Sequence, residues 1–229
     1  MTASDSRGEG GGEATRSCSR PTELPRWGPA ALLVGSSLFA VYATLFPLLL
    51  PLADAKDDFG VAVRHPSWRW LAAAAFAGIL CMLAGFQAVY ARIQARSGWL
   101  GSVGYPLIQL AYLLQACRVS WELLVYPAMA GNAGSAFLLR GGTFWHDPWV
   151  SLFSRTSALV ILAGVLLFGA AIFRSREFPK LAPACFVVGA LAYAAGSMLS
   201  IYLAVAGVLV LTVGCFLLGR GLLDGNAGG

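Results

Sequence analysis

Long apolar stretches alternate with short polar ones along most of the chain. A helix needs about 20 consecutive apolar residues to cross the hydrocarbon core of a bilayer. Stretches of about this length are Gly28–Leu50, Trp70–Arg92, Ser102–Tyr126 and Ser151–Phe173. The last apolar stretch, Leu181–Gly219, would be about 58 Å long as a single helix, nearly twice the core thickness. Divided near Ser197–Ser200, it gives two further spans. The pattern therefore predicts an all-α fold, a six-helix transmembrane bundle.

The composition supports this prediction and narrows the class of protein. The chain of 229 residues is 58% hydrophobic and only 12% charged, and its mean hydropathy is +0.70. Soluble domains usually contain about 25% charged residues. These values exclude an ordinary cytosolic enzyme, a disordered chain and a nucleic-acid-binding domain. We expect membrane lipids, and no nucleic acid, among the partners.

The positions of the basic residues predict the orientation in the membrane, because cytoplasmic loops carry the excess of Lys and Arg. With the N-terminus inside, the cytoplasmic segments hold ten: Arg7, Arg16, Arg20, Arg26, Arg92, Arg96, Arg174, Arg176, Lys180 and Arg220. The outer loops then hold four: Lys56, Arg64, Arg69 and Arg140. We therefore expect both termini to be cytoplasmic.

Three regions follow from these patterns. Residues 1–26 are rich in Gly, Ser and Arg and lack hydrophobic periodicity, which predicts a disordered cytoplasmic tail. Residues 27–220 are predicted to form the six-span transmembrane domain, and residues 221–229 a short cytoplasmic tail. Ala53-Asp54-Ala55 resembles a signal-peptide cleavage site, but the preceding apolar stretch exceeds the roughly 7–15 residues of a signal core. We expect the first span to be retained.

The third span carries charged residues within apolar sequence, which raises the free energy of its insertion into a bilayer. Gln115, Arg118, Glu122 and Tyr126 follow one another at spacings of three and four, so they share one helical face. A charge near the bilayer centre costs about 2.5–3.5 kcal/mol on insertion scales. Arg118 and Glu122 are expected to pair, and Arg155 of the fourth span is expected at a similar depth. This polar intramembrane cluster is either a binding or transport site or a structural clasp between helices.

Glycines supply the clearest helix-packing signal. Gly189 and Gly196 lie seven residues apart in the fifth span, and Gly207 and Gly214 have the same spacing in the sixth. Each pair gives its helix a flat face on which another backbone can approach closely. We expect the last two helices to form a tight antiparallel hairpin.

The cysteines and histidines of the sequence give little support for metal or redox chemistry. The five cysteines are isolated, and the two histidines, His65 and His146, fall in predicted outer loops beside prolines. A metal site formed by His65, His146 and Asp147 is a weak candidate. The rival interpretation is an aromatic belt at the membrane surface, formed by Trp68, Trp70, Trp145 and Trp149. Familiar catalytic motifs are missing, so the sequence favours a non-enzymatic protein without deciding the question, and it implies no cofactor.

The stretch Leu167–Leu181 ends one helix in an Arg-Ser turn and opens the next with Phe178-Pro179-Lys180-Leu181. Together with Gly189, Tyr193 and an arginine in the third span, this pattern is similar to a bacterial family of six-span membrane proteins catalogued only as a domain of unknown function. The resemblance covers about residues 70–200. It implies six helices and an inner-membrane location, and no activity.

Three functions remain open at this stage. The first is a non-catalytic membrane subunit or scaffold that packs against other membrane proteins in a larger complex, or against further copies of itself. The second is a small transporter or lipid-binding protein that uses the Arg118/Glu122 face. The third is a metal- or haem-dependent redox protein. In each case we expect a multi-pass protein of the bacterial inner membrane.

Overall fold

The computed structural model describes residues 27–51, 59–130 and 146–227, and all regular structure in these ranges is helical. The all-α prediction is therefore confirmed. The elements are α1 (Trp27–Leu49), α2 (Gly60–Val63), α3 (Ser67–Ser120), the π-helix η1 (Trp121–Val125), α4 (Tyr126–Ala130), α6 (Pro148–Ser175), α7 (Leu181–Leu199) and α8 (Ile201–Ala227). The predicted N-terminal tail lies outside the described residues.

Four helical stretches of the described chain are long and apolar enough to cross a membrane: Trp27–Leu49, Ser67–Ala130, Pro148–Ser175 and Ile201–Asp224. A fifth apolar helix, Leu181–Gly196, is shorter. Lengths and hydropathies of this kind are those of a membrane protein.

The long helix α3 consists of two antiparallel halves that reverse at Gly98. Gly98 has φ +59° and ψ −148°, a conformation that residues with a Cβ almost never adopt. Beyond it the chain returns along itself: the Gln109 side-chain amide donates to the Leu83 carbonyl at 3.0 Å, and the rings of Tyr90 and Tyr105 stack 4.2 Å apart. The first half contains the second predicted span, and the second half, continued by η1 and the start of α4, contains the third.

Neighbouring helices approach closely at glycines, each of which lies against the backbone of the next helix. Between α7 and α8, a Cβ added to Gly189 would lie 2.7 Å from the carbonyl oxygen of Gly207, and one added to Gly214 would lie 2.5 Å from the Phe186 nitrogen. The backbone of α8 likewise lies against Gly196. The four predicted packing glycines thus sit where the two helices meet. Further close approaches were absent from the sequence analysis. Gly35 faces Gly78 between α1 and α3, and between α3 and α6 Gly104 and Gly164 each lie against the backbone of the other helix.

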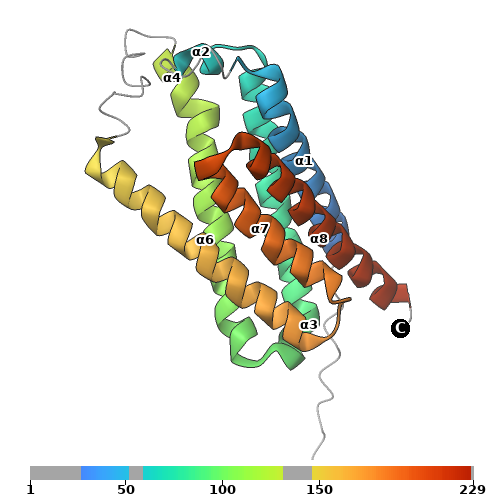
Figure 1. Ribbon diagram of the computed structural model, residues 1–229. Coiled ribbons are helices and arrows are strands. Elements are labelled where there is room, and N and C mark those ends of the chain that lie inside the picture. The colour runs from blue at the N-terminus through green and yellow to red at the C-terminus, as the bar shows by residue number, and fades with distance from the viewer. Residues whose placement is uncertain (1–26, 52–58, 131–145, 228–229) are drawn as a thin grey trace, which may run out of the picture.

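The helices surround an aromatic core at the centre of the molecule. The rings of Phe86, Phe168 and Phe186, from α3, α6 and α7, contact one another edge to face and are fully buried. Helix α1 packs against the first half of α3 and against α8, as Figure 1 shows. The Thr212 hydroxyl donates to the Val208 carbonyl of its own helix at 2.8 Å and also lies 3.4 Å from the Ser36 carbonyl of α1.

The start of α1 and the end of α8 lie at the same end of the molecule. Gly219 of α8 packs near Leu33 and the Pro29 carbonyl of α1. Nearby, Glu177 of the α6–α7 connection pairs with two basic residues that precede the α3 reversal, Arg92 at 3.3 Å and Arg96 at 2.6 Å. Ion pairs of this kind hold the two connections together.

Two predicted boundaries are located by the structure. Ser200 has extended backbone angles (φ −162°, ψ 131°) and separates α7 from α8, within the predicted interval Ser197–Ser200. Helix α8 continues to Ala227, so most of the region assigned to a short C-terminal tail, 221–229, is helical.

We predict that Gly189→Leu destabilises the protein, because its side chain would have to displace the backbone of α8 near Leu211. Overpacking of this kind costs about 1–3 kcal/mol or more. Thermal unfolding in detergent, followed by intrinsic fluorescence, measures the change. Val188→Leu is the matched control, since Val188 is exposed on the same helix. Equal midpoints for both variants would contradict the tight interface.

Candidate functional site

The candidate site begins at a local defect in the helix that carries Glu122. In the π-helix η1 the Tyr126 N–H bonds to the Trp121 carbonyl, five residues earlier. The next donor in this pattern would be residue 127, which is a proline and has no N–H. The Glu122 carbonyl therefore receives no backbone donor from this pattern.

Trp68 supplies the missing donor. Its indole Nε1 donates to the Glu122 carbonyl at 2.6 Å, and its ring is only 2% exposed. Phe46 and Phe59 pack against the indole with ring centroids 5.6 and 5.4 Å away. A buried polar group left without a partner is costly, so this bond ties the start of α3 to η1.

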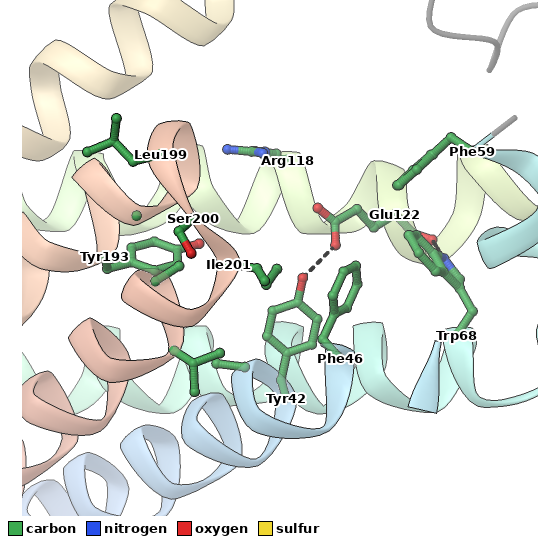
Figure 2. A pocket seen from close by; sticks show the side chains of 14 residues that line it. Tyr42, Phe46, Phe59, Trp68, Arg118, Glu122, Tyr193, Leu199, Ser200 and Ile201 are labelled. Carbon is green, nitrogen blue, oxygen red and sulfur yellow. Dashed lines mark hydrogen bonds between the residues drawn. The ribbon is translucent and has the colours of Figure 1, made fainter. Parts of the chain in front are cut away.

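The Glu122 carboxylate faces α1. Its Oε2 accepts a hydrogen bond from the Tyr42 hydroxyl at 3.1 Å, drawn as the dashed line in Figure 2. Tyr42 itself is held in place by rings on both sides along α1, Phe39 at 6.0 Å and Phe46 at 5.3 Å. The carboxylate is thereby fixed by a neutral donor on another helix.

Arg118 lies one turn before Glu122 but does not form the predicted ion pair. The two side chains attract each other electrostatically, yet Arg118 takes part in none of the ion pairs or hydrogen bonds among the described residues. Figure 2 shows why: the Glu122 carboxylate is turned to Tyr42, and the Arg118 side chain points toward α7, where Tyr193 lies. Its five N–H donors are therefore available to a ligand.

Two cavities meet at these side chains. The larger, of about 430 Å³, lies between α1, η1 and the α7–α8 turn, and Tyr42, Trp68 and Ser200 are among its lining residues. The smaller, of about 280 Å³, lies between η1, α6 and α7. Both are lined by Phe59, Arg118, Glu122 and Tyr193. A group bound at Arg118 is thus accessible from both sides.

The other members of the predicted cluster behave differently from each other. Gln115 lines the smaller cavity, and its side-chain amide lies beside the Tyr193 hydroxyl. Arg155 is exposed on α6 and lines neither cavity. The structure therefore brings Gln115, Arg118 and Glu122 together and leaves Arg155 out. Helical periodicity could not show which way the α6 face is turned.

The weak metal candidates have other roles. Asp147 Oδ1 caps α6 by accepting from the backbone N–H groups of Trp149 and Val150 at 2.8 and 3.1 Å. His65 Nδ1 accepts from the Ser67 N–H at 3.3 Å, and His146 is exposed. In the part of the chain that the structure describes, no group of three metal-ligating side chains comes together.

The sequence analysis missed several residues of the site. Trp68 was assigned to an aromatic belt, which is wrong for this residue because its indole is buried. Trp70 and Trp149, by contrast, are 80% and 77% exposed, as residues at a membrane surface would be, while Trp145 lies outside the described residues. Tyr42 was not singled out, and Ser200 was named only at a helix boundary. The proline five residues after Glu122 was the one available signal for a displaced helix bond.

Comparison with protein-family models, with curated proteins and with solved structures found no match to this chain.

We predict that Trp68→Phe destabilises the protein by about 1–3 kcal/mol, because the Glu122 carbonyl is then buried without a donor. The same substitution is expected to cost less in a Pro127→Ala background, where residue 127 regains an N–H. Unfolding free energies of both single variants and the double variant complete the thermodynamic cycle. Strictly additive costs would show that the two residues do not share this carbonyl.

Proposed function

We propose that this is a multi-pass protein of the bacterial inner membrane with six spans and both termini cytoplasmic. The two antiparallel halves of α3, together with α1, α6, α7 and α8, supply six helical segments. The basic connections around Glu177 lie near the end at which α1 begins, which fits a cytoplasmic face under the positive-inside rule.

We infer that its function is to bind an anionic group at Arg118. The observation that carries this proposal is a guanidinium that lines two cavities and has no hydrogen-bonding partner among the described residues. A planar fork of donors matches carboxylate or phosphate oxygens. Within a membrane such a charge is costly unless it meets a counter-ion, and a bound anion would provide one.

The surrounding groups suit an anion better than a cation. Tyr42 occupies one oxygen of Glu122 with a hydrogen bond, which leaves that carboxylate less free to neutralise Arg118 or to bind a cation. The hydroxyls of Tyr193 and Ser200 line the larger cavity as further neutral donors. The subunit or scaffold hypothesis stays a prediction, because no feature of the described residues identifies a fixed protein partner.

We predict that Arg118→Gln abolishes binding of an acidic molecule that accompanies the protein from its own membrane. Native mass spectrometry of gently extracted protein detects the bound mass. Arg155→Gln is the matched control, since it removes an equal charge from an exposed site outside the cavities. The proposal fails if the wild-type protein carries no acidic ligand, or if both variants retain it equally.

Glu122→Gln tests whether the negative charge of Glu122 opposes the binding of an anion at Arg118. Removing the negative charge beside Arg118 eliminates a repulsion toward an anion, while the amide can still accept from Tyr42. We expect the affinity for the acidic ligand to rise about tenfold, which corresponds to a gain of about 1.4 kcal/mol in binding free energy. Competition binding against the wild-type protein measures the ratio, and a weaker affinity would indicate that Glu122 itself holds the ligand.

A further inference from the structure

The smaller cavity forms a groove between α6 and α7 that is polar at one level and apolar at another. Arg118 and Gln115 approach it from the second half of α3. On the side of the groove nearer the end of α6, the lining side chains are apolar: Leu114, Ile161, Leu162, Val165 and Leu191. A molecule that fills the groove therefore needs both an anionic and an apolar part.

A buried hydroxyl points to a ligand independently of Arg118. Ser157 of α6 is 9% exposed and lines the groove, and its Oγ is the buried side-chain oxygen that lacks a hydrogen-bond partner in the described chain. Serine hydroxyls on a helix commonly bond to a carbonyl one turn earlier, as Ser120 does to Cys117 at 2.6 Å. Ser157 does not, so its donor remains available to an acceptor in the groove.

The groove is accessible from the side of the bundle. Leu162 and Leu191, which line it, are also 41% and 36% exposed, and Ala158 and Ala194 are exposed between them. At the other end of the groove the rings of Trp121 and Phe153 contact each other, with centroids 5.2 Å apart. In a bilayer these flanking side chains face lipid, so a lipid molecule can enter directly from the membrane.

We propose that the ligand of Arg118 is an anionic phospholipid, whose phosphate lies between Arg118 and Ser157 and whose acyl chain follows the apolar part of the α6–α7 groove into the surrounding bilayer. This inference rests on the proposed anion-binding function and adds the class of ligand. A soluble phosphate ester would match the charge of Arg118 equally well. The apolar lining of the groove and its lateral opening are what favour a lipid.

The test uses the full chain in nanodiscs of dioleoyl phosphatidylcholine that contain a small fraction of a brominated lipid. Bromine quenches tryptophan on contact, and Trp121 lines the groove. Brominated phosphatidic acid is compared with brominated phosphatidylcholine at the same fraction. We expect stronger quenching by phosphatidic acid, and we expect Trp121→Phe or Arg118→Gln to remove this excess.

Two variants of α6 test the groove itself. Ala158→Leu fills part of the groove and should weaken the binding of phosphatidic acid about tenfold, which corresponds to a loss of about 1.4 kcal/mol in binding free energy. Thr156→Leu adds similar bulk on an exposed part of the same helix outside the groove, and should have no effect. An unchanged affinity in Ala158→Leu, or equal quenching by the two brominated lipids, overturns the lipid inference.

Glycerol 3-phosphate, which carries the headgroup chemistry without acyl chains, separates this inference from the proposed function. Its binding to the same nanodiscs is measured by calorimetry with the wild-type protein and Arg118→Gln. Arg118-dependent binding as tight as that of phosphatidic acid would mean that the anion site exists and the lipid inference is wrong. If Arg118→Gln alters the binding of neither compound, the anion-binding function fails as well.

Discussion

The site depends on a single missing backbone donor. Because Pro127 has no N–H, the π-helix cannot satisfy the Glu122 carbonyl, and the indole of Trp68 does so from the start of α3. This bond joins two segments 54 residues apart in sequence at one end of the bundle. It also fixes the turn from which the Glu122 side chain extends toward Tyr42, and so determines that Arg118, one turn earlier, is left without its expected partner.

Close helix packing elsewhere creates the space that this turn borders. Glycine contacts hold α7 against α8 along most of its length, so the two helices turn back tightly at Ser200. Helix α7 has 19 residues, against 28 in α6. In Figure 1 the α7–α8 turn stops short of the end of the molecule at which α2 and α4 lie, and the larger cavity lies between this turn, α1 and η1. The tight packing of α7 against α8 thus accounts for the larger cavity beside α1 and η1.

Sequence patterns predicted the features that depend on one helix at a time. Apolar length located the helices, and glycine spacing identified the faces of α7 and α8 that meet. The residues of the site were predicted only in part, because their roles depend on contacts between helices. Arg118 and Glu122 have the spacing of an ion pair, but Tyr42 of α1 competes for the carboxylate. Trp68 has the sequence context of an interfacial residue, but its bond to the Glu122 carbonyl and its packing against Phe46 and Phe59 keep it buried. Arg155 was expected at a similar depth, but it is exposed on α6 and lines neither cavity.

The direction of the Arg118 side chain bears on whether it serves a ligand or simply reaches for the membrane surface. Side chains on a helix lean toward its N-terminus. For the second half of α3, which η1 and α4 continue, that direction leads away from Ala130 at the end of α4. Ala130 comes 12 residues after Arg118, or about 18 Å along the helix. To reach the membrane surface at this end, the Arg118 side chain would have to point against the direction in which side chains lean on its helix. It instead points toward α7, where Tyr193 lies, and its side chain is exposed in the two cavities that it lines. Its position is therefore that of a charge that faces the cavities, where an anion entering between α6 and α7 can reach it.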